Sequence, residues 1–485
     1  MNPDPRLADR LARHGQDHLL RWWDELDEPQ RSTLAEQIEQ IDLERLSDLV
    51  TRLVQDEEES SPDPSRVDSV EVARLPQTDA GRVARRRAIE VGESALASGE
   101  VAALLVAGGQ GTRLGFDGPK GTYAIGPVSG ASLFQIHAEK LLARSRRHGR
   151  LIPLYVMTSP ENHEETIQFF DDHDRFGLDH VRFFTQGQMP AVDRQSGKIL
   201  LADKDRIALS PDGHGGTLAA LAAPGAFGEP SCLEEMRELG IRTLFYFQVD
   251  NPLVQVCDPA YIGLHRRADA ELSFKIVEKR SPEEKVGVVV NIDGQPRVIE
   301  YSNLAPELAE RREPDGSLQL WAGSIAIHLF EREFIERLVS RGGQLPFHRA
   351  LKKVRHINSE GLTIEPDEPN AVKFETFIFD ALPMARKWAI VETERSTEFE
   401  PLKNAIGADS PASVRQRMSD LFACWLESAG ARVLRRSDGT VPFGIEISPL
   451  YALDAQELKA KLPSPPTIDR PIFLGPGVVS GATRP

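Results

Sequence analysis

Apolar residues near the amino terminus recur every three or four positions, which is the spacing of an amphipathic helix. The recurring positions are Leu34, Ile38, Ile41, Leu46, Leu49 and Leu53. A second helical pattern covers residues 80–100, and the acidic, proline-containing run DEEESSPDPS (56–65) between the two favours a solvated linker. We therefore predict a helical amino-terminal region over residues 1–95.

From residue 101 onward, short apolar runs bounded by turns alternate with helical segments, and each run predicts a strand. The predicted strands are VAALLVA (101–107), LIPLYVMTS (151–159), VRFFTQ (181–186), TLFYFQVDN (243–251) and ELSFKIVEK (271–279). The segment 132–147 between the first two has helical spacing. Strand, glycine-rich loop, helix and strand in this order predict an α/β fold with a mixed, mostly parallel, Rossmann-like sheet flanked by helices.

This pattern assigns residues 96–403 to one catalytic domain, in which segment 283–330 forms an antiparallel excursion rich in short strands and turns. Right-handed crossovers place the carboxyl ends of parallel strands along one edge, where ligands bind. Residues 404–485 contain one more helix (413–430) and a proline-rich segment, and we predict that they form a small carboxyl-terminal domain.

Composition narrows the function classes. The 485 residues are 40% hydrophobic and 27% charged, as in a soluble globular protein, and no apolar run approaches the roughly 20 residues that span a bilayer. The amino terminus lacks the apolar core of a signal peptide. A net charge of −16 argues against nucleic-acid or anionic-membrane partners. Three widely spaced cysteines indicate neither a zinc site nor a disulfide framework, which predicts a cytoplasmic protein.

Residues 101–150 depart from the overall acidic balance, with seven Lys or Arg against two acids. The cations of ARSRRHGR (143–150) are explained by the carboxyl end of a helix, whose dipole they complement. Arg113 and Lys120 instead lie among glycines and need another account.

That glycine-rich segment follows the first predicted strand directly. It reads Gly108-Gly109-Gln110-Gly111-Thr112-Arg113-Leu114-Gly115, and then Gly118-Pro119-Lys120-Gly121. Glycines let backbone N–H groups approach phosphate oxygens, and two cations can neutralise a triphosphate. The segment is not a Walker A loop, because Lys120 follows a proline and precedes a glycine, and three residues separate Gly111 from Gly115, which excludes the dinucleotide fingerprint.

LLVAGGQGTRLGFDGPKG (104–121) resembles the signature of the UDP-sugar pyrophosphorylases, and most closely that of the eukaryotic-type UDP-N-acetylhexosamine pyrophosphorylases. Nine further blocks resemble the family in the same order, so the similarity covers roughly residues 80–405. The blocks are MTSPENHEET, FFTQGQMPAVD, SPDGHGGTLAAL, FQVDNPLVQVCDP, KVGVVV, VIEYSNL, LWAGSIAIH, NAVKFETFIFD and FEPLKNA. The resemblance implies a nucleotidyltransferase of the GT-A-like type that joins UTP to a sugar 1-phosphate, with Mg²⁺ as cofactor.

The resemblance also implies roles for individual residues. The implied catalytic cations are Arg113, Lys120 and Lys403. The implied nucleotide contacts are Gly108, Gly109, Gly111, Thr112, Gln186, Gly213, His214 and Asp250. Gln186 matches the glutamine that recognises uracil, and Asp250 follows a strand where its carboxylate can bind Mg²⁺. The implied sugar-phosphate contacts are Glu300, Ser324 and Lys373.

Two residues depart from the acetylhexosamine pattern, which has asparagine where this chain has His214 and Ser324. A glycine-histidine-glycine sequence at residue 214 is closer to the UDP-glucose pyrophosphorylases. Glucose or galactose 1-phosphate therefore stays an alternative to N-acetylglucosamine 1-phosphate. A sensor that binds sugar nucleotides without catalysis is an alternative of another class, and a nucleotide-binding interaction module built on the amino-terminal helices is a further one.

The expected chemistry needs no general base. The nucleophile is a phosphate oxygen that is largely ionised at pH 7, because the second pKa of a phosphate monoester is near ~6. Catalysis is then expected from positioning and charge neutralisation in an in-line displacement that releases pyrophosphate. The sequence leaves open which sugar is used and whether the protein is a monomer or an oligomer.

Overall fold

The computed structural model describes residues 3–55, 63–225, 228–340, 345–462, 464 and 466–480. The chain forms two compact units, each assembled from three stretches. Unit 1 comprises Met1–Pro62, Gln186–Ala220 and Gln344–Ala381, and unit 2 comprises Asp63–Thr185, Leu221–Gly343 and Leu382–Pro485. The division into 1–95, 96–403 and 404–485 stays a prediction. The predicted linker falls largely on residues 56–62, outside the described residues.

Unit 2 is built on a ten-stranded sheet in the order β1-β12-β14-β10-β2-β3-β4, with β13 next to β12, β11 next to β14, and β19 next to β11. The strands are β1 (Val67–Ser69), β2 (Val101–Val106), β3 (Leu154–Thr158), β4 (Val181–Thr185), β10 (Thr243–Gln248), β11 (Leu272–Glu278), β12 (Val288–Ile292), β13 (Gln295–Ile299), β14 (Ala322–Glu331) and β19 (Trp388–Glu392). The run β10-β2-β3-β4 is parallel, whereas β12, β13 and β14 pair antiparallel. The predicted α/β class and the antiparallel excursion are confirmed.

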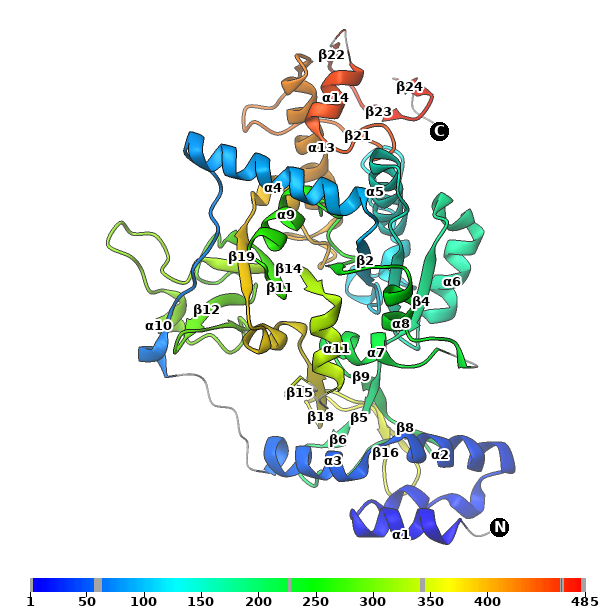
Figure 1. Ribbon diagram of the computed structural model, residues 1–485. Helices are drawn as coiled ribbons and strands as arrows, with labels where there is room; N and C mark the ends of the chain where they lie inside the picture. The colour runs from blue at the N-terminus through cyan, green and yellow to red at the C-terminus, as the bar shows by residue number, and fades with distance from the viewer. Residues whose placement is uncertain are drawn as a thin grey trace. The chain divides into compact units, whose positions relative to one another are not determined.

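Helices flank this sheet (Figure 1). They are α4 (Asp79–Ala97), α5 (Leu133–His148), α6 (His163–Asp172), α8 (Cys232–Glu238), α9 (Pro259–Arg267), α10 (Pro306–Ala309), α11 (Arg332–Ser340) and α12 (Arg395–Glu398). Ser132 begins α5 by accepting a hydrogen bond from the Gln135 N–H, which satisfies one of the free amides at the helix start. The predicted helix 132–147 therefore agrees with the structure within one residue.

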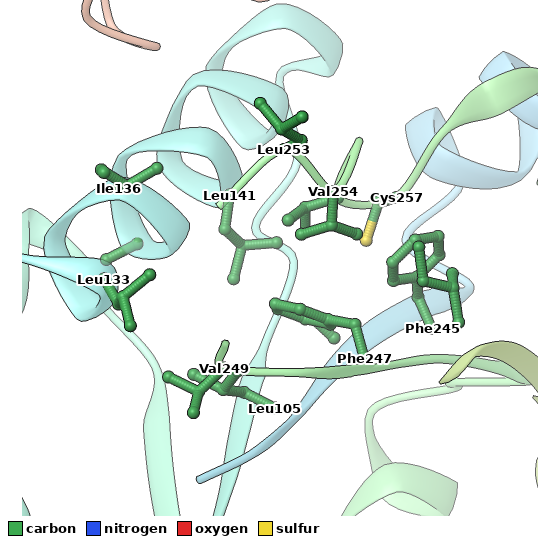
Figure 2. Packing of buried hydrophobic residues seen from close by; sticks show 14 of the residues in the cluster. Leu105, Leu133, Ile136, Leu141, Phe245, Phe247, Val249, Leu253, Val254 and Cys257 are labelled. Atoms are coloured by element: carbon green, nitrogen blue, oxygen red, sulfur yellow. The ribbon is translucent and has the colours of Figure 1, made fainter. Parts of the chain in front are cut away.

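The core of unit 2 lies between α5 and the sheet. Figure 2 shows Leu133 and Leu141 of α5, Phe247 of β10 and Val254 of the following segment in one buried apolar cluster. The strand β10 is buried along nearly its whole length, because helices and loops cover both of its faces.

The carboxyl-terminal part of unit 2 has a small core of its own. Its elements are α13 (Pro411–Ser428), β20 (Arg432–Val433), β21 (Ile445–Ile447), α14 (Ala455–Lys461), β22 (Thr467–Ile468), β23 (Ile472–Gly475) and β24 (Val478–Ser480), drawn in orange and red in Figure 1. Glu446 accepts hydrogen bonds from the N–H groups of Val128 and Ser129, at 2.7 Å each, so this part is fastened to the chain just before α5.

Unit 1 combines the amino-terminal helices with short antiparallel strands. Its elements are α1 (Pro5–Arg13), α2 (Glu28–Gln40), α3 (Leu43–Val50), β5 (Gln188–Pro190), β6 (Val192–Asp193), β7 (Leu201–Asp203), β8 (Arg206–Ile207), β9 (Leu209–Pro211), β15 (Phe347–Lys352), β16 (His356–Ile357), β17 (Thr363–Ile364) and β18 (Ala371–Thr376), and α7 (Thr217–Ala222) continues into unit 2. The periodic leucines and isoleucines of the first helices are buried against Val372 and Phe374 of β18, so the predicted amino-terminal helices are confirmed. None of the helices in the described ranges has the length and apolar character needed to cross a membrane.

Candidate active site

The glycine-rich loop between β2 and α5 closes on itself through backbone hydrogen bonds. The N–H of Lys120 donates to the carbonyl oxygen of Gly109, and the N–H of Gly111 donates to that of Gly118, both at 3.0 Å. Two short 3₁₀ turns, η5 (Thr112–Leu114) and η6 (Lys120–Thr122), lie inside and at the end of this closed segment. The loop is therefore preformed by its own backbone.

Packing explains why glycine occupies two positions of the glycine-rich loop. A Cβ at Gly111 would lie 2.6 Å from the ring of Phe116, and a Cβ at Gly121 would lie 2.1 Å from the ring of Phe134. Either contact is shorter than side-chain atoms adopt, so a larger residue would displace the loop. Thr112 and Arg113 are exposed on the outer turn, where they are accessible to a ligand.

The β-sheet register brings the loop and Asp250 together. Val106, the last paired residue of β2, lies opposite Gln248, the last paired residue of β10. Gly108 and Asp250 each follow two residues later, so both lie at the carboxyl edge of the parallel strands, where ligands bind in α/β folds.

Lys120 is held at this edge by two groups. Its ammonium donates a hydrogen bond to the carbonyl oxygen of Leu402 at 3.2 Å and lies 3.8 Å from Asp250 Oδ2. The N–H of Leu402 in turn donates to the carbonyl oxygen of Asp250 at 2.8 Å. Lys403 follows Leu402 directly, and its backbone N–H donates to the carbonyl oxygen of Asp409. The structure thus assembles Lys120, Asp250 and Lys403 from three distant stretches of unit 2.

The two predicted sugar contacts of unit 2 meet at Gly287. The N–H of Ser324 donates to the carbonyl oxygen of Gly287 at 2.8 Å, and a Cβ at Gly287 would lie 3.4 Å from Glu300 Oε1. Ser324 also lies near the edge that carries Asp250, because β14 runs antiparallel to β10 with His328 opposite Tyr246. Glu300 and Ser324 are both partly exposed.

In unit 1 the predicted uracil-binding segment at Gln186 lies against the glycine-rich turn at residues 212–216. A Cβ at Gly187, the residue after Gln186, would lie 2.5 Å from Asp212 Oδ2. Thr376, at the end of β18, fixes this turn by donating its N–H and its hydroxyl to the Asp212 carbonyl oxygen, at 2.7 and 2.9 Å. Gly213 follows with φ +85°, a left-handed conformation that favours glycine.

His214 is packed among aromatic side chains, and one of its two ring nitrogens is available to a ligand. The N–H of Ile378 donates to Nδ1 at 3.2 Å, so the ring is assigned the neutral form with its proton on Nε2. The ring packs against Phe377 and Phe379, and burial lowers its pKa to about 4. His214 is therefore uncharged at neutral pH, and it is suited to donate a hydrogen bond rather than to accept a proton.

Asp212 is a functional candidate that the sequence did not single out. Within the described residues its Oδ1 is buried without a hydrogen-bond partner. Burial raises its pKa to about 6, against the smaller opposing effect of Arg45. Its position in the SPDGHGGTLAAL block, which resembles the family, was the available signal.

The predicted phosphate contact Lys373 lies on β18 opposite Ala350. It alternates with the buried Val372 and Phe374, so its side chain is on the other face of the strand.

A fully buried lysine supports the segment after Asp250. Lys275 on β11 donates hydrogen bonds to Asp258 Oδ2, at 3.0 Å, and to Glu398 Oε1. The carbonyl oxygen of Glu398 accepts a hydrogen bond from the side chain of Asn251, the residue next to Asp250, at 2.8 Å. Lysine in the apolar strand ELSFKIVEK was the only sequence signal, and it did not reveal the two carboxylate partners.

A glycine-rich loop at the carboxyl edge of a mostly parallel sheet, with one lysine fixed beside a carboxylate, defines a nucleotide-binding enzyme of the α/β class. The chain belongs to the family of UTP–glucose-1-phosphate uridylyltransferases, whose model matches residues 45–441. The resemblance found in the sequence is thereby confirmed.

Three similar proteins cover nearly the whole chain. UDP-N-acetylhexosamine pyrophosphorylase-like protein 1 of Homo sapiens is 38% identical over 483 residues, which cover 93% of this chain and 94% of that protein. The UDP-N-acetylglucosamine pyrophosphorylase of Saccharomyces cerevisiae is 36% identical over 439 residues, with 86% and 90% covered. The crystal structure of the Trypanosoma brucei uridine diphosphate N-acetylglucosamine pyrophosphorylase in complex with inhibitor has a TM-score of 0.81 at 27% identity, with 98% and 99% covered.

Proposed function

We propose that this protein transfers the uridylyl group of UTP to N-acetylglucosamine 1-phosphate and releases pyrophosphate. The observation that carries the proposal is Lys120, fixed beside Asp250 at the end of a closed glycine-rich loop. Relatives whose names are UDP-N-acetylglucosamine pyrophosphorylase (S. cerevisiae) and probable UDP-N-acetylglucosamine pyrophosphorylase (Dictyostelium discoideum), which cover 86% and 93% of this chain, support this sugar.

We assign phosphate binding to the loop and the cations of unit 2. The exposed turn at Thr112 and Arg113 and the accessible backbone at Gly108 and Gly109 are suited to the triphosphate. Lys120 would neutralise charge near the α-phosphate, since its hydrogen bond to the Leu402 carbonyl oxygen leaves two of its three donors available. Arg113 and Lys403 would add to the positive field.

The reaction is an in-line displacement at the α-phosphate of UTP. An oxygen of the sugar 1-phosphate attacks phosphorus, the new P–O bond forms, and the bond to pyrophosphate breaks. The attacking oxygen is already ionised at neutral pH, so these residues act by holding two anions together rather than by taking a proton. The neutral His214 is consistent with this, because a ring whose pKa is lowered to about 4 is a weak base.

Asp250 is our candidate ligand for Mg²⁺. The described residues contain no group of three or more His, Cys, Asp or Glu side chains that could hold a metal ion by themselves. A single carboxylate fits Mg²⁺ held mainly by substrate phosphates and water, which is how this ion binds in many nucleotide enzymes. The ion would supply positive charge to the phosphate oxygens.

The remaining roles divide between base and sugar. Gln186 would read the uracil edge with its amide, which offers both a donor and an acceptor, and Gly213 and His214 would line the same nucleotide. Glu300 and Ser324, which meet at Gly287, would contact the sugar, and Lys373 would contact its phosphate. His214 keeps its Nε2 proton to donate, so the departures at His214 and Ser324 both bear on sugar choice.

We also propose that the reaction takes place in the cytoplasm. Cys232, Cys257 and Cys424 are all free thiols in the structure, and Cys424 is exposed. Exposed free thiols suit a reducing compartment.

Pyrophosphate release from UTP tests the proposal with a panel of sugar 1-phosphates. The panel contains N-acetylglucosamine, N-acetylgalactosamine, glucose and galactose 1-phosphate, and we expect the highest kcat/KM with the first. A preference for glucose 1-phosphate would replace the proposed sugar but keep the chemistry. Saturable UTP binding without release for any sugar would favour a sensor instead.

A further inference from the structure

Unit 2 contains a cavity of about 280 Å³ that the proposed reaction does not use. It lies between α5, the segment Pro252–Val256, α13 and the chain around β21 and the start of α14. Its walls are mostly apolar, formed by residues such as Ile136, Leu421, Phe422, Trp425, Pro449 and Leu453. We call this space the α13 cavity.

Two cations of α5 line the α13 cavity. Lys140 donates to the carbonyl oxygens of Pro252 and of Val254, the latter at 2.9 Å, and burial lowers its pKa to about 7. Arg144, one turn further on, is only 6% exposed. Among the described residues, Arg144 Nε has no hydrogen-bond partner and the guanidinium has no carboxylate within ion-pair distance. A buried guanidinium nitrogen without a hydrogen-bond partner is costly, and an anionic group in the cavity would supply that partner.

The neighbouring carboxylates do not fill that place, because each is already bound to other donors. Glu446 accepts from Val128, Ser129 and the Ser129 hydroxyl. Asp454 accepts from Arg147 and from the first turn of α14, and Asp258 accepts from Lys275 and the N–H of Ala260. Glu446 and Asp454 line the cavity but are held by these other donors, so neither is paired with Arg144.

We propose that the α13 cavity is a binding site for a small amphiphilic carboxylate, whose carboxylate pairs with Arg144 and whose apolar body lies against Leu421, Phe422 and Trp425. A planar carboxylate matches the two-pronged geometry of a guanidinium. A phosphate would bring a second negative charge into an apolar space at a higher desolvation cost. The volume is slightly below the usual range for drug-sized ligands, so it fits about a dozen non-hydrogen atoms.

The site has a structural link to the candidate active site. Lys140 and Arg144 lie on the helix that follows the glycine-rich loop, and Pro252–Val256 begins two residues after Asp250. A ligand in the α13 cavity would therefore contact α5, which follows the glycine-rich loop, and the segment that follows Asp250.

Binding is tested on the full-length protein without UTP, so the outcome is independent of the proposed reaction. The probe is 4-phenylbutyrate, and 4-phenylbutan-1-ol is its uncharged counterpart of the same length. Isothermal titration calorimetry at pH 7.5 should give a Kd on the order of 0.1 mM for the acid and at least about tenfold weaker binding for the alcohol. Arg144→Gln should weaken acid binding by about tenfold or more and leave alcohol binding unchanged.

A second pair of variants keeps the test valid if Arg144→Gln does not fold. Ala455 lines the cavity at the first position of α14, where an added acidic side chain is favourable for the helix. Ala455→Glu should weaken binding of 4-phenylbutyrate relative to the equally large Ala455→Gln, while the alcohol should not distinguish them. The proposal is overturned if acid and alcohol bind equally well, if folded Arg144→Gln binds the acid like the wild type, or if no saturable binding occurs up to about 10 mM.

Discussion

The ammonium group of Lys120 donates a hydrogen bond to the carbonyl oxygen of Leu402, although 282 positions separate the two residues in the chain. Leu402 also donates its N–H to the carbonyl oxygen of Asp250, so one residue joins the glycine-rich loop to the end of β10. This contact gives Lys120 a fixed position before any substrate binds, which is the condition under which a charge stabilises a transition state most.

Replacing Lys120 should therefore impair the chemical step more than the fold. We expect Lys120→Met to lower kcat/KM by roughly 10²–10³, the scale of losing one preorganised charge. Pyrophosphate release under UTP-limited conditions measures the effect. Lys387→Met, at an exposed lysine paired with Asp269, is the control and should behave like the wild type. Near-normal turnover of Lys120→Met would remove Lys120 from the catalytic set.

Two glycines of the loop should respond differently to the same substitution. A Cβ at Gly109 would meet no protein atom within 4 Å, whereas one at Gly111 would collide with Phe116. We expect Gly109→Ala to change the free energy of unfolding by less than about 0.5 kcal/mol but to raise the KM for UTP, because its methyl group would occupy ligand space. Gly111→Ala should lose about 1–3 kcal/mol of stability. Urea unfolding and UTP kinetics on both variants check this, and an unchanged KM for Gly109→Ala would place UTP elsewhere.

Gln186 is expected to determine base selectivity more than rate. Removing its amide in Gln186→Ala should reduce the preference for UTP over CTP by roughly tenfold, the scale of one lost hydrogen bond at a buried position. The measurement is the ratio of kcat/KM for the two nucleotides. Gln195→Ala, at an exposed position in the turn after β6, is the matched control. If UTP and CTP are distinguished equally by wild type and Gln186→Ala, uracil is recognised by another residue.

The sequence predicted those parts of the site whose pattern is local. The strand, the glycine-rich loop and α5 follow one another in the chain, so Lys120 and the sheet edge could be located without a structure. The position of Asp250 followed as well, since β10 is an apolar run that ends just before it. These predictions depend on short-range periodicity and on turn chemistry.

Other parts depend on contacts that carry no residue-type signal. The partner of Lys120 is a backbone carbonyl at Leu402, and the partner of His214 is a backbone N–H at Ile378. Every residue has such groups, so no spacing rule could identify them. At Arg144 the sequence-based interpretation was incomplete for another reason. Its charge was assigned to the helix dipole because the residue lies near a helix end, but the side chain is buried.

The buried ion cluster of Lys275, Asp258 and Glu398 should be important for stability. Lys275 is 2% exposed, and its removal would leave two buried carboxylates without their cation. We expect Lys275→Met to lower the free energy of unfolding by about 3–5 kcal/mol. Lys387→Met, which breaks an exposed ion pair, should cost at most about 1 kcal/mol. Urea unfolding of the two variants makes the comparison, and similar losses would contradict the assigned role of the buried cluster.

His137 should give the protein part of its sensitivity to acid. Its ring is buried against Phe247, its Nε2 lies 3.0 Å from the carbonyl oxygen of Val249, and burial lowers its pKa to about 3 from the ordinary 6.5. Between these two values the unfolded chain binds a proton that the folded protein does not, so the free energy of unfolding falls as the pH falls from 6.5. One such proton contributes a slope of about 1.4 kcal/mol per pH unit.

His137→Gln keeps a side-chain N–H for the Val249 carbonyl oxygen but cannot take up that proton. We therefore expect its free energy of unfolding to fall less steeply than that of the wild type between pH 6 and pH 4, by up to about 1.4 kcal/mol per pH unit, and the two to change in parallel above pH 7. His173→Gln, at an exposed histidine, is the matched control and should keep the slope of the wild type. Urea unfolding at closely spaced pH values gives the three slopes, and a His137→Gln slope equal to that of the wild type would show that this ring does not contribute to acid unfolding.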